Sequence, residues 1–512
     1  MQACAEDSAR PPMHLSPSER RAQGTESPVG AAASSTSWKW AGPLVFAVVL
    51  AGTLPSLPHG ILNWDNEVKL QVARNLVHGR GWALGETPDD ATYLAVGQGG
   101  RRYPPYPPLA YALQLVTLVT APLLEGPCEG APTLLVLALL GWALVAWGRA
   151  ADVSLEAAVA GALLVTLGTV LWPMATFGYD ALVEALVLAL ILRAGAGVAA
   201  ERPWGLAGLA FGAAIATRLG ASVLGFSAAL LLLAQRPSGP VPILRRALAF
   251  GLGALPGAAL VLWFNWFRFG SPLTFLHVAG PAVRGLNLSW WSSQHVEGMV
   301  GLLVSPGKGL FWYSPVLIGV LAAAVPLARR FDSTMAALGV QLVASVVVFG
   351  RFRYWHGDWA WGPRYVAALC VAAAPLAWWW VARAGDGRAR RRGLVVLLAL
   401  IALQALPVVG DPVGNHFELT LRPLEASGQL VTHPVTRPPE PEDFRVHYYR
   451  PANSPFVSLA RTFGRALGDP HRALDLAWGL VRAAVAPLLA LWLLVRVRRR
   501  RLEPKPRLRP LS

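Results

Sequence analysis

The stretch GLVVLLALIALQALPVVG, residues 393–410, contains 18 residues and no charged side chain. About 20 apolar residues in an α-helix cross the hydrocarbon core of a bilayer, so this stretch predicts a membrane-spanning helix. Similar runs recur along the 512 residues, of which 54% are hydrophobic and 14% charged, so the sequence predicts an all-α polytopic membrane protein. The candidate spans lie near residues 40–58, 109–123, 132–147, 155–172, 179–193, 204–217, 220–234, 247–266, 311–327, 334–350, 364–382, 393–410 and 476–497.

The two ends of the chain are polar. Residues 1–37 are rich in Ser, Ala, Pro and charge and lack the apolar core of a cleavable signal, so we expect a disordered cytoplasmic tail followed by an uncleaved first span. Residues 498–512 form a second, basic tail. The net charge of +16 is concentrated in runs such as 388–392 and 498–501, which flank spans. Their position indicates that these runs determine membrane topology and do not form a nucleic-acid-binding surface. We therefore expect no nucleic-acid partner.

Topology follows from the basic runs, because Lys and Arg stay on the cytoplasmic side. Residues 235–246, 328–330 and 383–392 and the C-terminus are then inside. The intervening loops face outward and hold most of the Trp, Tyr, His and isolated charges. These outward segments are 59–108, the turn at 217–220, 267–310, 351–363 and the long loop 411–475.

Thirteen spans from an inside N-terminus would leave the basic C-terminal tail outside, against the charge rule. One candidate is therefore not a full crossing. The segment 109–124 is short and follows the proline-rich approach YPPYPP, residues 103–108, which suits a lateral or re-entrant path.

Several chemistries lack support. The three cysteines, Cys4, Cys128 and Cys370, imply no disulfide framework, and the ten histidines show no zinc-site spacing. No glycine-rich phosphate loop follows a strand, which argues against ATP-driven work. Energy for any reaction should come from the substrate.

A series of short motifs occurs in order along the chain, at the predicted outward boundaries. An acidic motif DNE at 65–67 precedes the run 68–78 and the YPP at 106–108, FGYDALVE (177–184) opens a span, and ATR (216–218) ends one. LVSPGKGL (303–310) and WAWGPRY (359–365) follow. Over residues 40–410 this order resembles the GT-C superfamily of multi-spanning glycosyltransferases, which includes protein O-mannosyltransferases and the aminoarabinose transferases of lipid A.

The resemblance implies a GT-C-like bundle of about 12–13 transmembrane helices in a bacterial plasma (inner) membrane, with the active site on the extracytoplasmic face. It implies transfer of a hexose or pentose from a polyprenyl-phosphate-linked donor to a glycan, lipid or protein acceptor among the membrane lipids. One departure concerns the acidic motif: the family commonly has adjacent Asp-Glu, whereas Asn66 separates Asp65 from Glu67 here. Which carboxylate is the base stays open.

The chemistry needs a base for the acceptor hydroxyl and positive charge for the departing lipid phosphate. Asp65, with Glu67 next in line, is the candidate base, and partial desolvation is expected to raise its pKa toward the working pH. The structural alternative is that Asp65 is an exposed loop acid that caps the N-terminus of a helix starting near Glu67. Arg218, Lys308 and Arg364 are the candidate phosphate ligands, although boundary cations also snorkel to lipid headgroups in proteins of any function.

Further side chains are expected to bind substrate. Asp180 and Glu184 are four residues apart on one helix face, so both can face one cavity or pair with arginines for stability. Tyr106, His356 and Asp358 complete the set. No metal or other cofactor is expected to be obligatory, but a divalent cation held by His356, Asp358 and Asp65 is an alternative.

The rival function is a transporter or flippase that moves a lipid or solute without covalent chemistry. Transporters commonly show repeated halves and ionisable groups near the bilayer midplane. No half-to-half similarity is evident here, and the charges gather at one boundary. The enzyme hypothesis depends on Asp65, Glu184, Arg218, Lys308 and Arg364 meeting in one place.

Overall fold

The computed structural model describes residues 28–58, 60, 64–84, 94–196, 202–234, 240–274, 295–352, 355–357, 360–384, 387–427 and 449–502. The fold is helical apart from a two-stranded antiparallel hairpin in the first outward segment, in which β1 (Ala95–Val96) pairs with β2 (Arg102–Tyr103). The helices of the first half are α2 (Pro28–Thr53), α3 (Trp64–Val77), α4 (Pro108–Thr120), α5 (Ala131–Ala150), α6 (Leu155–Leu167), α7 (Leu171–Thr176), α8 (Ala181–Ala196), α9 (Arg202–Thr217), the 3-10 helix η3 (Leu219–Leu224), α10 (Gly225–Ala234) and α11 (Pro240–Phe269).

The second half contains shorter and more interrupted helices. The run predicted as one span at 311–327 is divided among three of them. In order they are α12 (His295–Val304), α13 (Leu310–Tyr313), α14 (Val316–Ala322), α15 (Ala324–Arg330), α16 (Asp332–Gly350), the 3-10 helix η6 (Ala367–Ala372), α17 (Ala373–Arg383), α18 (Gly387–Val409), α19 (Pro412–His416), the π-helix η7 (Phe417–Leu421), α20 (Arg422–Ala426), α22 (Pro455–Leu467) and α23 (Pro470–Leu502).

Six helices within the described residues are long and apolar enough to cross a membrane. Shorter apolar helices accompany them, so the prediction of an all-α multi-pass membrane protein is confirmed. Burial separates the centre of the bundle from its edge, because 78% of the apolar window of α5 is buried but only 17% of that of α11. The six are 37–56, Ala131–Ala150, 241–269, Asp332–Gly350, Gly387–Val409 and 470–498.

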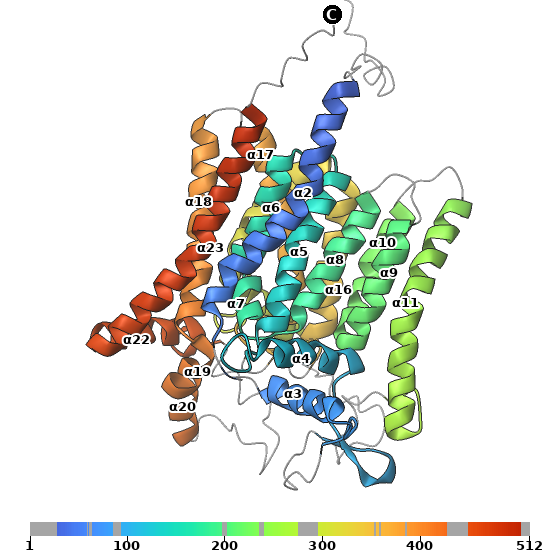
Figure 1. Ribbon diagram of the computed structural model, residues 1–512, viewed down its shortest axis with the longest axis vertical. Coiled ribbons are helices and arrows are strands. Elements are labelled where there is room, and N and C mark those ends of the chain that lie inside the picture. The colour runs from blue at the N-terminus through green and yellow to red at the C-terminus, as the bar shows by residue number, and fades with distance from the viewer. Residues whose placement is uncertain are drawn as a thin grey trace, which may run out of the picture.

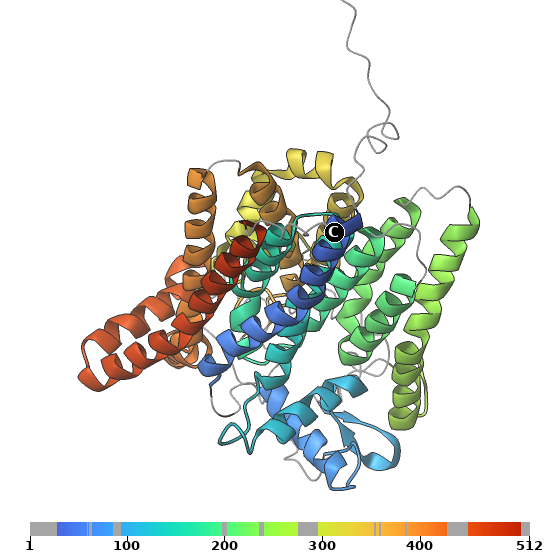
Figure 2. The ribbon, with the colours of Figure 1, turned by 45° about the horizontal axis from the view of Figure 1, so that its top comes forward.

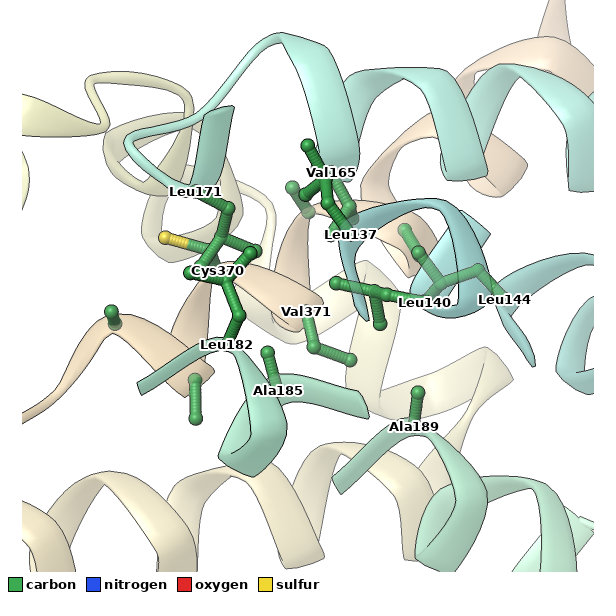
Figure 3. Packing of buried hydrophobic residues seen from close by; sticks show 14 of the residues in the cluster. Leu137, Leu140, Leu144, Val165, Leu171, Leu182, Ala185, Ala189, Cys370 and Val371 are labelled. Carbon is green, nitrogen blue, oxygen red and sulfur yellow. The ribbon is translucent and has the colours of Figure 1, made fainter. Parts of the chain in front are cut away.

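The centre of the bundle is a contact zone of α5, α6, α8 and η6. Leu137, Leu140 and Leu144 of α5 face Ala185 of α8 and Val371 of η6 (Figure 3), and all five are buried. At the far end of this zone the rings of Trp147 and Trp378 meet edge to face with centroids 4.6 Å apart. Removing one such buried side chain would cost about 2–5 kcal/mol, so this zone holds the helices that carry the polar groups in register.

At the edge, α9 and α11 pack backbone against backbone. A Cβ at Gly208 would collide with the carbonyl of Phe250, and one at Gly257 would collide with the backbone of Gly212. Small residues that permit this approach drive helix association in lipid, where burial of apolar surface gives no advantage. The pair closes the bundle on the side shown in green in Figures 1 and 2.

The segments predicted to face outward gather at one end. The helices α3, α4, α19 and α20 lie at the end opposite the C-terminus (Figure 1). Since α4 packs on α3 there, the segment predicted as span 109–123 does not run alongside α5 as a crossing helix. The other twelve candidate spans are an even number, which agrees with both tails on the cytoplasmic side.

Several predicted boundaries differ. Helix α2 begins at Pro28, so residues 28–37 of the predicted disordered tail are helical, and residues 1–27 lie outside the described residues. Helix α23 begins at Pro470 and continues to Leu502, into the basic tail. The long outward loop contains the helices α19, α20 and α22, and α22 contacts α23 (Figure 2).

Candidate active site

Helix α3 directs Asp65 and Lys69 toward the bundle, because residues four apart lie on one helix face. Lys69 is buried, whereas the side chain of Asp65 is 34% exposed. Glu67 lies about 200° around the helix from Asp65. It accepts a hydrogen bond from Gln71 (3.1 Å) and lies 3.9 Å from Arg74, away from the other site residues. Glu67 thus lies apart from Asp65 in this structure, and its catalytic role stays a prediction. Asp65 is not an N-cap, because the helix begins before it at Trp64.

Asp180 is the junction of three segments. Lys69 Nζ lies 3.0 Å from its Oδ2 atom, and Arg218 Nη1 lies 3.1 Å from its Oδ1 atom. Arg218 also reaches Glu184 Oε1 through Nε, at 2.9 Å. Asp180 and Glu184 stand one turn apart at the start of α8, so a single guanidinium spans both. Asp180 and Glu184 therefore share one helix face, as predicted, and Arg218 is the arginine that pairs with both carboxylates.

Arg364 joins this group to Asp65. Its Nη1 atom lies 3.3 Å from Asp65 Oδ2, and its guanidinium carbon is 5.2 Å from the ring centre of Tyr365. Arg218 approaches the same ring at 5.0 Å. Tyr365 itself stacks on Phe349 of α16 with centroids 5.1 Å apart. Both guanidinium groups thus approach one aromatic ring, and each gains cation–π stabilisation from it.

Tyr106 closes the group from the proline-rich segment. Lys69 Nζ lies 4.5 Å from its ring centre, and its hydroxyl donates a hydrogen bond to Asp65. The backbone carbonyl of Tyr106 accepts from the hydroxyl of Tyr111 (3.1 Å) and from Arg268 (3.4 Å), and that of Pro104 accepts from the same two side chains at 3.1 and 3.0 Å. Residues from α4 and α11 therefore fix the turn that presents Tyr106.

The electrostatics of Asp65 differ from the expectation. Burial would raise the pKa of its carboxyl, but Arg364, Lys69 and the Tyr106 hydroxyl together outweigh burial and hold the pKa below the ordinary value of 3.8. The predicted rise toward the working pH is therefore wrong, because the cations that surround Asp65 could not be placed from sequence. The carboxylate is ionised at neutral pH and able to accept a proton.

Asn66 lies between the two carboxylates of the motif, and its side chain is buried and hydrogen-bonded to two other segments. Its Nδ2 atom donates to Glu129 Oε2 (3.1 Å) and to the carbonyl of Gly178 (3.2 Å). Gly178 has φ = 72°, a left-handed conformation that glycine adopts without strain. A Cβ at Gly178 would lie 2.5 Å from Asn66 Nδ2. Asn66 thus connects α3 to the segments that precede α5 and α8.

Replacing Asn66 with aspartate is expected to destabilise the fold by about 3–5 kcal/mol at neutral pH, because a carboxylate would face Glu129 and a carbonyl without a donor. The midpoint of thermal unfolding in detergent measures this. Asn75→Asp is the matched control on the same helix, since Asn75 Nδ2 donates to the carbonyl of Ala83 at 3.0 Å rather than to an acid. An equal loss in both variants would contradict the special role of Asn66.

Lys308 and His356 form a second polar group beside Arg364. Lys308 is buried and donates to the carbonyl of Ala360. Burial, followed by the charges of Lys308 and Arg364, holds the pKa of His356 well below its ordinary value, so the ring is neutral at neutral pH. The charge of Lys308 also reaches His416, whose Nδ1 atom is 2.7 Å from Ser458 Oγ of α22.

The structure thus brings together Asp65, Tyr106, Asp180, Glu184, Arg218 and Arg364, with Lys308 and His356 adjacent. Glu67 is apart, and Asp358 lies outside the described residues. Sequence reasoning missed Lys69, Glu129 and Tyr365. The four-residue spacing from Asp65 would have indicated Lys69. No three His, Cys, Asp or Glu side chains in the described part of the chain are arranged to hold a metal ion, so the expectation of no obligatory metal stays a prediction.

Comparisons with known proteins give a structural likeness only. No protein-family model and no curated protein matches the sequence. A crystal structure of ArnT from Cupriavidus metallidurans bound to undecaprenyl phosphate is 19% identical over 92% of this chain and 82% of that chain, with a TM-score of 0.49. The apo state of the same ArnT is 17% identical over 90% and 77%, also with a TM-score of 0.49. Both likenesses extend over at least 90% of this chain.

Proposed function

We propose that this protein is a membrane glycosyltransferase of the GT-C type, which moves a sugar from a polyprenyl-phosphate-linked donor to an extracytoplasmic glycan, lipid or protein acceptor. The observation that carries the proposal is the meeting of Asp65, Asp180, Arg218 and Arg364, which lie between 38 and 299 residues apart along the chain where they pair, at one end of the bundle. The basic runs on the other side of the predicted spans support an outward position for that end in the plasma (inner) membrane.

Asp65 acts as the base. The acceptor oxygen attacks the anomeric carbon, its proton passes to Asp65, and the bond to the phosphate oxygen breaks with its electron pair, which inverts the configuration. Asp65 suits this role because it is ionised and still 34% exposed, so an acceptor hydroxyl can reach it. Tyr106 orients the carboxylate through its hydroxyl.

Lys69, Arg218 and Arg364 stabilise the departing phosphate. These three cations face three carboxylates, those of Asp65, Asp180 and Glu184, so the group is held together without a donor. Asp180 and Glu184 aim Arg218 rather than contact sugar, which revises their predicted role. Charge-assisted hydrogen bonds to a phosphate are worth about 1.5–3 kcal/mol each. Lys308 and the neutral His356 extend the site on the side of α22. There they contact the sugar or the acceptor.

The rival transporter function fits this arrangement less well. A transport site is expected near the bilayer midplane, between repeated halves. Here the acids and cations sit beside α3 and α4, which lie at the outer end of the bundle.

The test uses purified protein in proteoliposomes with a polyprenyl-phosphate donor that carries a radiolabelled hexose or pentose, together with a cell-envelope fraction as acceptor. The proposal expects label in the acceptor fraction and one polyprenyl phosphate released per sugar transferred. Intact donor on the opposite leaflet, without release of polyprenyl phosphate, would establish a flippase and overturn the proposal.

A further inference from the structure

A cavity of about 470 Å³ lies at the opposite end of the bundle from Asp65. It is lined by Lys39 and Gly42 of α2, Trp142 and Arg149 of α5 and Arg193 of α8. At about 30 Å³ per water, it has room for roughly fifteen waters, enough for a phosphate-containing headgroup.

The cavity lies one membrane thickness from the candidate active site. Glu129, which is bonded to Asn66 in the site, directly precedes α5, and Arg149 is in the last turn of that helix. Twenty helical residues rise about 30 Å, which is also the thickness of the hydrocarbon core. The cavity therefore sits at the level of the cytoplasmic headgroups.

Three cations converge on this cavity. Lys39, Arg149 and Arg193 make no ion pair with any residue that the structure describes. Arg149 and Arg193 lie in the last turns of their helices, where a cation also interacts favourably with the helix dipole. That explanation does not cover Lys39, which lies well inside α2. Nor does it account for the cavity between the three.

Aromatic and apolar side chains continue from the cavity toward the hydrocarbon core. Trp142 lies against Gly42 and meets Phe46 edge to face at 6.4 Å. Leu139, Trp142 and Arg149 share one face of α5, and the first two are 38% and 45% exposed. An acyl chain can lie along Leu139 and Trp142 while its headgroup reaches Arg149, an arrangement that a soluble anion would not need.

We propose that this cavity binds the headgroup of an anionic phospholipid of the cytoplasmic leaflet. The cations pair with its phosphate, and the Leu139–Trp142 face holds an acyl chain. Basic pockets between transmembrane helices on the cytoplasmic side suit such lipids. The site is separate from the transferase chemistry, so its test needs no activity assay.

The experiment is native mass spectrometry of the full chain, released from detergent with phosphatidylglycerol or with phosphatidylcholine of the same acyl chains. We expect phosphatidylglycerol to be retained preferentially. Arg149→Gln and Arg193→Gln should each weaken its binding roughly fivefold. The control is Arg329→Gln, an exposed cation in the last turn of α15 that does not line the cavity, which should leave binding unchanged.

Three outcomes would overturn the proposal. The two lipids could bind equally, or Arg329→Gln could weaken binding as much as Arg149→Gln. Inorganic phosphate could also displace the lipid at equal concentration, which would indicate a site for a soluble anion. Thermal unfolding of each variant in detergent establishes that a loss of lipid is not a loss of fold.

Discussion

Replacing Asp65 with asparagine is expected to lower sugar transfer by about 10²-fold or more, because the amide cannot accept the proton of the acceptor hydroxyl. The change keeps the size of the side chain and removes one partner of Arg364 at 3.3 Å. Initial rates at saturating donor and acceptor measure the loss, which should fall on kcat. Membrane insertion and the thermal unfolding midpoint should stay close to those of the unmodified protein, since Asp65 is partly exposed.

Glu67→Gln is the matched control for this experiment. Glu67 lies in the same turn of α3 but bonds Gln71, so its replacement should leave kcat within about twofold. Full activity in Asp65→Asn would move the base elsewhere. A large loss in Glu67→Gln would show that α3 presents its other face in the active state.

The pH profile gives a second reading of Asp65. Because its pKa is lowered below 3.8, Asp65 stays ionised down to acidic pH, and its protonation cannot produce an acid limb between pH 5 and 7. Removing the Tyr106 hydroxyl with Tyr106→Phe takes away one hydrogen bond that favours the ionised form. The pKa of Asp65 should then rise, so the fall in activity that its protonation causes at acidic pH should begin at a higher pH. A limb that does not respond to Tyr106→Phe belongs to another group.

Arg218→Ala is expected to destabilise the protein by about 3–5 kcal/mol as well as to abolish donor use. Arg218 is the ion-pair partner of both Asp180 and Glu184, at 3.1 and 2.9 Å, and its side chain is only 13% exposed. Its removal leaves Glu184 without its cation and Asp180 with Lys69 alone, in a low-dielectric setting. The unfolding midpoint in detergent and the KM for the donor measure the two effects.

A second variant separates stability from donor binding. In Arg218→Met combined with Glu184→Gln, one cation and one carboxylate are removed together, and Asp180 retains Lys69 at 3.0 Å. Stability should recover to within about 1.5 kcal/mol of the unmodified protein, because a well-packed neutral pair often replaces a buried ion pair at little cost. Donor use should remain impaired. Recovery of both would make Arg218 a structural residue and remove it from the phosphate site.

The helical, multi-pass architecture could be predicted because it depends on local signals. Apolar runs mark the spans, and basic runs set their direction, which even identified 109–124 as the segment that does not cross. The interruptions at 311–327 were not predicted. The break between α13 and α14 falls at Ser314 and Pro315, a helix-breaking signal that a hydropathy window averages out, whereas the break before α15 falls at Ala323, where the sequence gives no signal. The helix at residues 28–37 was not predicted either, because the composition of this segment is polar.

The members of the candidate site could be predicted more readily than their partners. Asp65, Asp180, Arg218 and Arg364 stand at outward boundaries in recognisable motifs. Their pairing could not be read from the sequence, since it depends on how α3, α8 and the segments around Arg218 and Arg364 meet. This is why the direction of the pKa change at Asp65 was wrong. Glu129 gave no signal at all, because a single acid in a turn resembles any exposed loop residue.

The bonds of Asn66 to Glu129 and Gly178 have an evolutionary consequence. Position 178 excludes any side chain, and the cavity it leaves is filled by the amide of residue 66. An aspartate at position 66, as in an adjacent Asp-Asp or Asp-Glu pair, would require a simultaneous change at position 129. Descendants of this chain should therefore vary at these three positions together or not at all.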